Sequence, residues 1–552
     1  MKQRLICLTA VSLIMGCTVQ KDRKEQESGG MAKIYKSEVW ESDLGQGIYS
    51  NPILYADYSD PDVIRAGKDY YMTASSFNCI PGLPILHSKD LVNWEIINYA
   101  LEKQVPDEVF KIPQHSKGVW APAIRYHKGE FYIYWGDPDF GVYMVKTKKI
   151  YGRWDKPVLV MEAKGIIDPC PFWEGKNAYL IHGWAGSRAG INSMLTIKKM
   201  NYEGTKVLDE GKNVFDGHGK HHTMEGPKLY KKDGYYYIFA PAGGVENGWQ
   251  VAMRSKNIYG PYEDRVVLEQ GSTKINGPHQ GAWIQTADGN SYFLHFQDQG
   301  VYGRVLHLQP MKWENGWPFI GTDFDGNGIG EPVGSARKPV ADRDLQIFHP
   351  QESDEFENGK PGLQWQWYAN SSVKWSAQIP GTGYLRLFAV KGNEDPNLWN
   401  YPNLLLQKLP APAFKATVKV KLTSEWETPG KTAGLILMGQ SYTYAAISFH
   451  DNKYWVRHVI CKRADSGNAE KIIEEKSLAS STVFLRMNIK APDALCSFSY
   501  SENGTDFTDI GTEAAAEKDL WISAKMGIFA KSDPNVRMGG YADFDWFRVT
   551  KQ

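Results

Sequence analysis

The chain has 552 residues, a length that predicts more than one domain with ample hydrophobic core. Its formal net charge is zero, which excludes bulk electrostatic attraction to nucleic acid or to an anionic membrane as the basis of its function. Aromatic residues make up 13% of the chain, including 19 tryptophans. Flat rings of this kind stack on sugar faces, although most aromatic residues pack in cores.

The N-terminus predicts a secretory signal. Lys2 and Arg4 precede an apolar stretch, residues 5–15, that is too short to span a bilayer. The run Leu13-Ile14-Met15-Gly16-Cys17 resembles a bacterial lipobox, in which the signal is cleaved before a cysteine that then carries lipid. The alternative is an ordinary signal peptide with a chance cysteine.

The lipobox interpretation assigns residues 1–16 to a lipoprotein-type signal peptide and residues 17–45 to a lipid tether and lead-in. Lipidation would fall on Cys17, and the polar residues 21–30 suit a tether. We expect the mature protein to be lipid-anchored outside the cytoplasm of a bacterium, in the periplasm or on the cell surface. Contact with the membrane is expected only through this anchor.

A hairpin pattern recurs five times after the lead-in. Each unit has a short β-rich run, a turn that contains glycine, and an aromatic strand, as in Lys228 to Phe239 around Asp233-Gly234. The units are about 50 residues apart and begin near Asp60, Ala121, Asp168, Glu225 and Gly281. Short strands repeated at this period predict an all-β fold: a five-bladed β-propeller, with one blade per unit.

Three of the five units present an acid at the start of their first strand: Asp60, Asp168 and Glu225. In a propeller the first strand of each blade lines the central channel, so these carboxylates should converge near the axis. Neighbouring carboxylates in one cavity separate in pKa, which lets a single site hold an acid and a base. The alternative is that Asp-Pro and Glu-Gly-Pro are only turn sequences.

The chain resembles glycoside hydrolase family 43 in its ordered motifs. These are Asn51-Pro52-Ile53-Leu54, Asp60-Pro61-Asp62, Pro84 to Trp94, Gly118-Val119-Trp120-Ala121-Pro122, Asp168-Pro169, Glu225-Gly226-Pro227 and Gly303-Arg304. Members of the family are five-bladed propellers that remove arabinofuranosyl or xylosyl units with inversion. The resemblance covers residues 51 to about 330.

The resemblance implies a role for each acid. Asp60 would be the general base that activates water, and Glu225 the general acid that protonates the leaving oxygen. Asp168 would orient Glu225 and modulate its pKa. Inversion places acid and base about 6.5–9.5 Å apart, with water between them.

Three residues are candidates for substrate binding. Phe77 follows the first hairpin at the channel end, Trp120 opens the second unit, and both suit stacking on sugar. Packing is the alternative for each. The resemblance makes Arg304 a binding residue with a fork of fixed donors, whereas a solvated strand-end arginine is the alternative.

No cofactor is expected to be required, although the resemblance allows a structural Ca²⁺ in the propeller channel. Family members often place a histidine near the axis, associated with water-coordinated calcium, and His279 occupies that place here; a hydrogen-bonded structural histidine is the alternative. Residues 323–328 match the start of an EF-hand loop, but the twelfth position is Gly334 instead of glutamate. We interpret that segment as a glycine-rich turn.

Four further cysteines have neither zinc spacing nor a dense disulfide pattern. Cys79 and Cys170 could line a pocket, but buried small apolar side chains are the favoured interpretation. A disulfide between Cys461 and Cys496 in the second domain is an open alternative.

The propeller is assigned to residues 46–335 and a Pro/Gly-containing linker to residues 336–350. Residues 351–552 then alternate as half-buried strands, for example 416–422, and predict an antiparallel β-sandwich. This part resembles the concanavalin-like sandwich that follows the propeller in one branch of the family and that can lend a loop to the active-site rim. An independent carbohydrate-binding module is the alternative.

The sequence therefore predicts an exo-acting, inverting glycoside hydrolase that removes terminal α-L-arabinofuranosyl or β-D-xylosyl units from plant cell-wall polysaccharides or oligosaccharides. Arabinofuranosidase activity ranks slightly ahead of xylosidase activity. One alternative is a tethered, non-catalytic glycan-binding protein, which the presence of all three acids disfavours. Another is a glycosidase for a different sugar, such as galactose or fructose.

Overall fold

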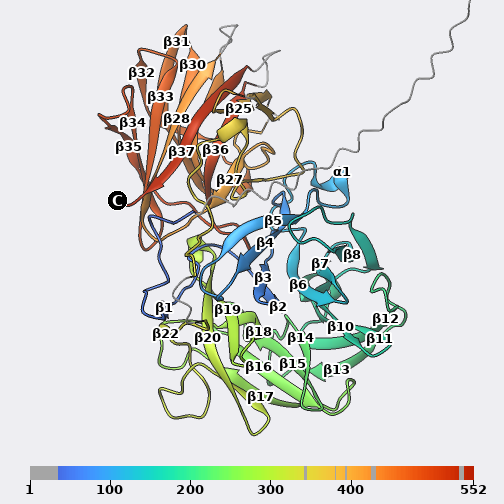
Figure 1. Ribbon diagram of the computed structural model, residues 1–552. Helices are drawn as coiled ribbons and strands as arrows, with labels where there is room; N and C mark the ends of the chain where they lie inside the picture. The colour runs from blue at the N-terminus through green and yellow to red at the C-terminus, as the bar shows by residue number, and fades with distance from the viewer. Residues whose placement is uncertain (1–34, 341–344, 380, 392–394, 424–429, 534–539) are drawn as a thin grey trace, which may run out of the picture. The chain divides into compact units, whose positions relative to one another are not determined.

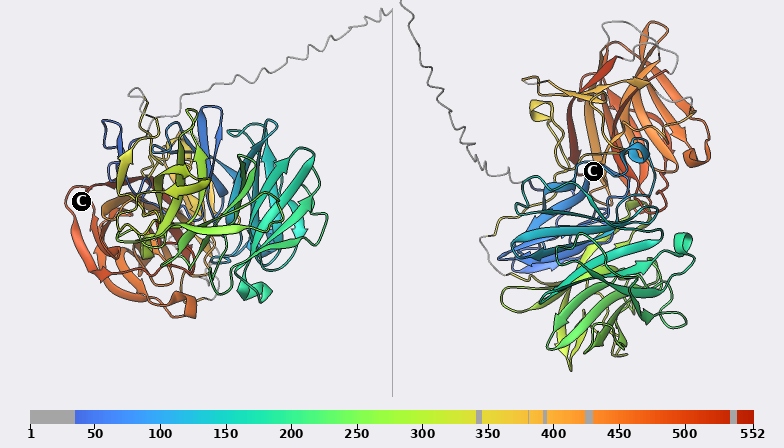
Figure 2. Two further views of the ribbon diagram at one scale, coloured as in Figure 1. Left: turned by 90° about the horizontal axis from the view of Figure 1, so that it is seen from below. Right: turned by 90° about the vertical axis from the view of Figure 1, so that its right-hand side faces the viewer.

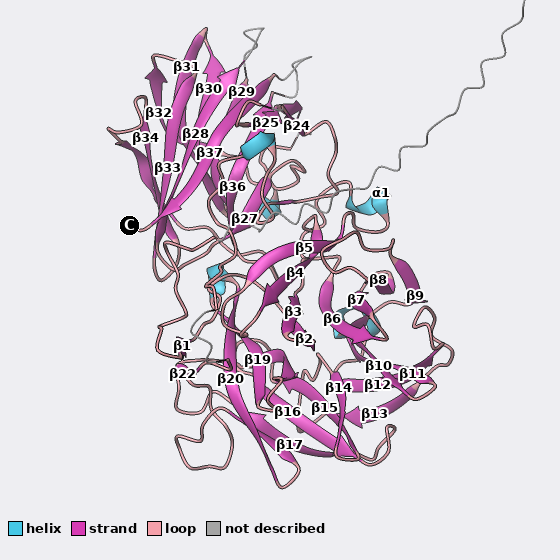
Figure 3. Ribbon diagram, viewed as in Figure 1, coloured by secondary structure: helices cyan, strands magenta, loops and turns pink. Residues whose placement is uncertain are grey.

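The computed structural model describes residues 35–340, 345–379, 381–391, 395–423, 430–533 and 540–552. Strands dominate these residues (Figure 3). The helices within them are short: α1 (Asp107–Phe110), α2 (Gly186–Ala189), η1 (Gly300–Tyr302), η2 (Glu357–Gly359) and η3 (Ala464–Ser466). None of the described helices is long and apolar enough to cross a membrane. The predicted signal peptide and the predicted lipidation site, Cys17, lie outside the described residues.

Five four-stranded antiparallel sheets confirm the five-bladed propeller. Their strands follow the chain, with β2 (Asp62–Ala66), β3 (Asp69–Thr73), β4 (Gly82–Ser88) and β5 (Glu95–Leu101) in blade 1; β6 (Trp120–His127), β7 (Glu130–Asp137), β8 (Gly141–Thr147) and β9 (Val158–Glu162) in blade 2; β10 (Ile166–Glu174), β11 (Asn177–Trp184), β12 (Met194–Met200) and β13 (Lys212–Asp216) in blade 3; β14 (Lys228–Lys232), β15 (Tyr235–Ala242), β16 (Trp249–Ser255) and β17 (Glu263–Leu268) in blade 4; and β18 (His279–Gln285), β19 (Ser291–Asp298), β20 (Arg304–Glu314) and β21 (Trp317–Ile320) in blade 5.

The first strand of each blade is innermost, as expected. Figure 1 shows β2, β6, β10, β14 and β18 around the centre of the ring. The hairpin between β14 and β15 confirms the predicted turn, because Asp233 and Gly234 both have positive φ, 48° and 81°. Two consecutive residues of this kind form the turn that matches the twist of a two-residue hairpin.

The ring closes through the first residues of the propeller, just after the lead-in. Strand β1 (Ile48–Ser50) pairs antiparallel with β22 (Ser335–Arg337), and Ile53 N–H donates to the Leu306 carbonyl at 2.7 Å. One apolar cluster joins blades 1 and 5. Strand β22 thus runs from the last residue assigned to the propeller into the predicted linker.

The sandwich consists of two antiparallel sheets, apart from one short parallel pair. One sheet contains, in spatial order, β23 (Gln366–Trp367), β27 (Leu405–Lys408), β36 (Lys525–Ser532), β29 (Lys431–Met438), β30 (Tyr442–His450), β31 (Lys453–Cys461) and β32 (Lys471–Leu478), with β26 (Val390–Lys391) parallel to β36. The other contains β24 (Ser376–Gln378), β25 (Leu385–Phe388), β37 (Tyr541–Thr550), β28 (Phe414–Thr423), β33 (Thr482–Lys490), β34 (Leu495–Ser501) and β35 (Thr508–Ala514). Figure 2 separates the propeller, blue through green, from the sandwich, orange to red.

The core of the sandwich follows from the alternation seen in the sequence. On β28, the side chains of Ala416, Val418, Val420 and Leu422 are buried in one apolar cluster with residues of the facing sheet, such as Leu435. The remaining cysteines, Cys79, Cys170, Cys461 and Cys496, are buried free thiols. The disulfide left open between the last two is therefore absent among the described residues.

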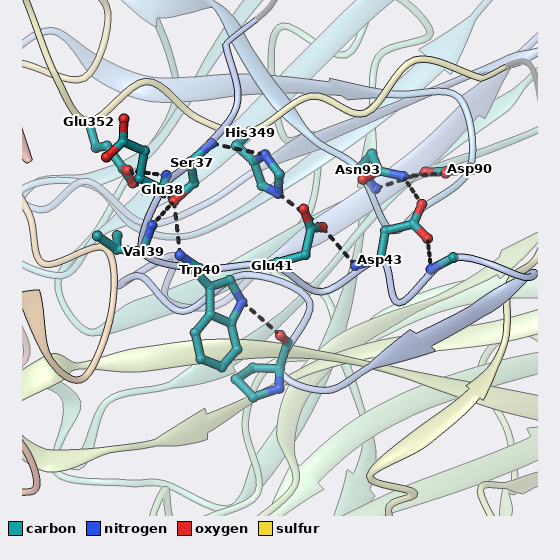
Figure 4. A network of polar contacts seen from close by, with 12 residues as sticks. Ser37, Glu38, Val39, Trp40, Glu41, Asp43, Asp90, Asn93, His349 and Glu352 are labelled. Carbon is teal, nitrogen blue, oxygen red and sulfur yellow. Dashed lines mark hydrogen bonds and ion pairs between the residues drawn. The ribbon is translucent and has the colours of Figure 1, made fainter. Parts of the chain in front are cut away.

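Polar contacts tie the lead-in to the segment before the sandwich (Figure 4). Ser37 Oγ donates to Glu352 Oε1 at 2.9 Å, and Ser37 N–H donates to His349 Nδ1 at 3.2 Å. Further along the lead-in, Asp43 Oδ2 accepts a hydrogen bond from Asn93 Nδ2 of blade 1 at 3.0 Å. The lead-in thus contacts both the propeller and the chain that enters the sandwich.

Candidate active site

Irregularities at the start of the inner strands aim side chains into the channel. Asp60, Ala121, Asp168 and Gln280 all have positive φ, at 54°, 29°, 56° and 40°. The pairing of β10 and β18 with their neighbours shifts register at these points. A bulge redirects a side chain that regular alternation would place elsewhere. Non-glycine residues in this conformation cost about 1–3 kcal/mol each and cluster at functional sites.

The fifth blade departs from the sequence prediction. Gly281 lies in the ladder opposite His295, and a Cβ there would approach the Leu294 carbonyl oxygen to 1.8 Å. The preceding residue, Gln280, occupies the irregular position and lines the pocket. The sequence assignment of Gly281 to the channel position was wrong by one residue, because the bulge has no sequence signature of its own.

A pocket of about 240 Å³ lies where these strands begin. It is lined by Asp60, Phe77, Trp120, Ala121, Ile167, Asp168, Thr223, Glu225, Gly244, Val245, Gln280, Arg304 and Trp521. The three acids and the three substrate-binding candidates from the sequence are thus brought together. His279 is not among the lining residues.

Asp60 is fixed by two donors. Ser75 Oγ donates to Asp60 Oδ2 at 2.6 Å, and Arg304 Nη1 donates to Asp60 Oδ1 at 2.8 Å. Asp60 and Arg304 are both buried, at 5% and 7% exposure. These two donors hold the Asp60 carboxylate in one position beside the Arg304 guanidinium, and a carboxylate held in this way can accept a proton from water.

Glu225 lies in different surroundings. Burial first, and then the negative charges of Asp168 and Asp60, raise the pKa of Glu225 above its ordinary value. Its side chain is 32% exposed, so the carboxyl group stays accessible. A carboxyl that keeps its proton near neutral pH and faces a pocket can serve as a general acid.

Asp168 connects to Glu225 through the backbone. Asp168 Oδ2 accepts the Gly226 N–H at 2.7 Å, which fixes the residue next to Glu225. Gly226 has φ of 58°, and a Cβ there would lie 2.9 Å from the Gln280 side chain, so glycine is required. Burial and the charge of Asp60 also raise the pKa of Asp168.

Aromatic rings form part of the pocket wall. Phe77 is 4% exposed and bridges to Val119 through the backbone. Trp120 Nε1 donates to the Ser116 carbonyl at 2.8 Å, and its ring lies 6.3 Å from that of Trp521 in an edge-on arrangement. Among the described lining residues, Trp521 alone comes from the sandwich.

Six lining residues escaped the sequence analysis: Ile167, Thr223, Gly244, Val245, Gln280 and Trp521. Gln280 was missed because its neighbour matched the repeat. Trp521 was missed because it lies between β35 and β36, outside every propeller motif. A tryptophan outside the propeller motifs is the one available signal, and it does not show which residues Trp521 contacts.

The surroundings of His279 do not form a metal-ligand set. The imidazole is fully buried, neither ring nitrogen has a hydrogen-bond partner, and Nε2 lies 3.6 Å from Glu225 Oε1. Burial and the positive charge of Arg304 lower the pKa of His279 to about 3. A single imidazole beside a guanidinium does not by itself hold a cation, so calcium in the channel stays a prediction.

Within the described residues, one carboxylate group has metal-like spacing, and it lies in the loop that the sequence compared with an EF-hand. Asp323, Asp325 and Glu331 bring one oxygen each within 4.8 Å of the others. Backbone N–H groups of the loop already donate to Asp323 and Glu331, as Gly326 does to Asp323 Oδ1 at 2.7 Å. These bonds explain the cluster as a turn.

The comparisons with known proteins agree with this geometry. The model of "Glycosyl hydrolases family 43" matches residues 49–318, and the "Beta xylosidase C-terminal Concanavalin A-like domain" matches residues 353–550. A protein from Xylanibacter ruminicola is 36% identical over 490 residues, covering 88% of this chain and 86% of that protein.

A "Beta-xylosidase" from Formosa agariphila is 30% identical over 592 residues, covering 99% of this chain and 97% of that protein. The crystal structure of a GH43 protein from Bacillus licheniformis has a TM-score of 0.78 at 26% identity, covering 92% of this chain and 100% of that one. Two matched domains in this order and relatives of nearly full length lead to one assignment: the chain belongs to glycoside hydrolase family 43.

Proposed function

We propose that this glycoside hydrolase removes single terminal pentosyl units from the non-reducing ends of plant cell-wall polysaccharides or oligosaccharides, with inversion. The observation that carries the proposal is a small pocket with three carboxylates. Its volume of about 240 Å³ lies below the range of about 300–1,000 Å³ typical of drug-sized ligands, and suits one sugar unit.

The roles follow from the surroundings of each acid. Asp60, paired with Arg304, is the base that takes a proton from the attacking water. Glu225, with its raised pKa, is the acid that protonates the leaving oxygen. Asp168 positions Glu225 through the Gly226 N–H and adds negative charge near it. A carboxylate paired with a guanidinium and a second carboxyl that keeps its proton form the pair expected for base and acid catalysis.

The terminal unit is β-D-xylose in the first instance, because the relative that matches this chain end to end is named a beta-xylosidase. α-L-Arabinofuranose is the second candidate. The two sugars present similar hydroxyl arrays, so the same donors, above all the Arg304 guanidinium, can bind both. This order reverses the slight preference for arabinose that the sequence alone gave.

Product analysis tests the proposal. The protein lacking residues 1–17 is incubated with xylo-oligosaccharides, arabinoxylan, arabinan and arabinosylated xyloglucan, and the products are separated by chromatography. Release of xylose or arabinose alone is expected, and longer fragments contradict exo action. Proton NMR of the first-formed sugar should show the inverted anomer; the retained anomer contradicts the assignment of Asp60 as a base.

We also propose that the chain is lipid-anchored through Cys17, which supports action on extracytoplasmic glycans. The support is the sequence Leu13-Ile14-Met15-Gly16-Cys17 and the polar tether after it. Metabolic labelling with a radioactive fatty acid in a bacterial host should label the wild-type protein and leave Cys17→Ala unlabelled. Equal labelling of both contradicts the anchor.

A further inference from the structure

Asp57 is a buried carboxylate just before the proposed base, and it accepts three hydrogen bonds. It is 3% exposed. Asp57 Oδ1 accepts from Ser59 Oγ at 2.7 Å and from Arg304 N–H at 3.1 Å, and Oδ2 accepts from Ser523 N–H at 2.9 Å. Three donors around one buried carboxylate fix its position and theirs.

Each donor belongs to a different part of the pocket. Ser59 is the residue before Asp60, and Arg304 is the residue whose guanidinium holds Asp60. Ser523 lies in the sandwich segment that carries Trp521. The backbone of Gly303 also lies close to the Asp57 side chain, because a Cβ on Gly303 would lie 2.5 Å from Asp57 Cγ.

The sandwich supplies the countercharge. Lys408 on β27 and Lys525 on β36 are direct partners across the two strands, and Lys408 Nζ lies 5.0 Å from the centre of the Tyr58 ring. Burial raises the pKa of Asp57, but the positive charges of Lys408 and Lys525 outweigh this and hold the pKa below its ordinary value. Burial and Lys525 also lower the pKa of Lys408 to about 7.

Lys408 and Lys525 repel each other when both are charged, and a nearby anion offsets that repulsion. Besides Asp57, the titratable groups near Lys408 include Tyr58 and the buried thiol of Cys79 from blade 1, whose pKa burial raises. Asp57 is the carboxylate whose negative charge offsets this repulsion.

We propose that Asp57 is a positioning residue for hydrolysis: its carboxylate ties the segment of the base Asp60, the backbone of Arg304 and the sandwich segment of Trp521 into one unit. This inference rests on the proposed function. The sandwich thereby acts on the catalytic centre through a buried carboxylate and two lysines, as well as through one ring at the pocket wall.

Asp57→Asn in the full chain tests the proposal. The asparagine side chain has the same shape as aspartate but only one acceptor oxygen. Its NH₂ group would face a donor, so at least one of the three hydrogen bonds is lost. We expect kcat/KM on xylobiose or an aryl β-D-xyloside to fall about 10- to 100-fold, the range for residues that hold catalytic groups in place. The loss should fall mainly on kcat and less on KM, because Asp60 and Arg304 are held less precisely in the pocket.

The matched control is Asp354→Asn. Asp354 is a buried sandwich carboxylate that also accepts three strong hydrogen bonds, from Phe356 N–H, Gly362 N–H and Trp365 Nε1, away from the pocket. It should lower the melting temperature and leave kcat/KM within about twofold. A loss of less than twofold in Asp57→Asn, or a loss that falls on KM alone, overturns the proposal.

A double variant keeps the proposal testable if Asp57→Asn does not fold. Asp57→Asn combined with Lys408→Met removes one charge of each sign and should fold where the single change does not. The loss of kcat/KM should persist in it, since Ser523 N–H still lacks its acceptor; recovery of wild-type kcat/KM means that Asp57 only balances charge, and overturns the proposal.

Hydrogen exchange separates this inference from the proposed function. Exchange at the peptide containing residues 519–524 should rise in Asp57→Asn relative to Asp354→Asn, whether or not the substrate assignment is correct. If the wild-type protein is inactive on every pentoside while exchange rises in Asp57→Asn as expected, the proposed function is contradicted but the positioning role of Asp57 is not. If exchange is unchanged in Asp57→Asn, the positioning role of Asp57 is contradicted.

Discussion

The propeller and the sandwich are both built from antiparallel sheets, but they use side chains in opposite ways. In the propeller, polar residues at the start of the inner strands face a common pocket, and their backbone leaves regular geometry to do so. In the sandwich, strands such as β28 alternate regularly and bury apolar side chains between two sheets. The sandwich reaches the pocket only through the segment between β35 and β36, as far as the described residues show.

This difference shows where function resides in β proteins. Regular alternation commits one face of a strand to packing, so it leaves little freedom to place a reactive group. Bulges and loops provide that freedom at a cost in backbone energy. Substitutions in the propeller and in the sandwich can test this division of roles.

The largest effect is expected for Glu225→Gln. The amide cannot protonate the leaving oxygen, so kcat on a natural xylo-oligosaccharide should fall about 10²- to 10⁴-fold, with much less loss on substrates whose leaving group needs no proton. Steady-state kinetics on both substrate types provide the measurement. Glu174→Gln, at the outer end of β10, is the control and should behave as the wild type. Near-normal turnover of the oligosaccharide by Glu225→Gln contradicts the assignment.

The pH dependence of the wild type comes next. Glu225 acts only while protonated, and its raised pKa keeps it so at neutral pH. As pH rises through that pKa the proton is lost, so kcat/KM should fall about tenfold per pH unit on the basic side. The residual activity of Glu225→Gln on an activated substrate should lack this basic limb. Its persistence there means that another group supplies the proton.

A smaller effect is expected for Trp521→Ala, which removes the contribution of the sandwich to the pocket wall. Loss of one ring on a sugar face should lower kcat/KM about tenfold, mainly through KM. Trp455→Ala is the control: this half-buried tryptophan lies in the same domain and stacks on His450 at 5.2 Å, away from the pocket. Equal effects of the two substitutions would show that the sandwich contributes stability alone.

The sequence predicted the blades and the three acids for a physical reason. Asp60, Asp168 and Glu225 stand beside proline or Gly-Pro at the same place in a repeat, so repetition and turn chemistry locate them without coordinates. The fold of the sandwich was readable from alternation in segments such as 416–422.

Features that depend on register or on distant segments could not be predicted. Gln280 takes the channel position only because the chain bulges there. Trp521 reaches the pocket because another domain packs on the propeller. Lys408 and Lys525 become partners through strand pairing, and nothing in either segment marks them as the countercharge of Asp57.

The smallest effect on activity, essentially none, is expected for Glu352→Gln at the junction of the lead-in and the sandwich. Burial raises the pKa of Glu352 to about 7, against the hydrogen bonds from Ser37 and Glu38 that lower it. The folded state therefore holds this proton more tightly than the unfolded state does. Stability from the group is present at low pH and is lost as pH rises from the unfolded pKa toward about 7.

Denaturant titrations at pH 5 and pH 8 provide the measurement. Between pH 5 and pH 8 the unfolding free energy of the wild type should fall by about 1–3 kcal/mol because of Glu352. In Glu352→Gln this contribution to the fall should be absent. Its kcat/KM should match the wild type at both pH values, because Glu352 contacts the lead-in and not the pocket. A change in kcat/KM would show that the lead-in is coupled to catalysis, and that the division between packing and function fails at this junction.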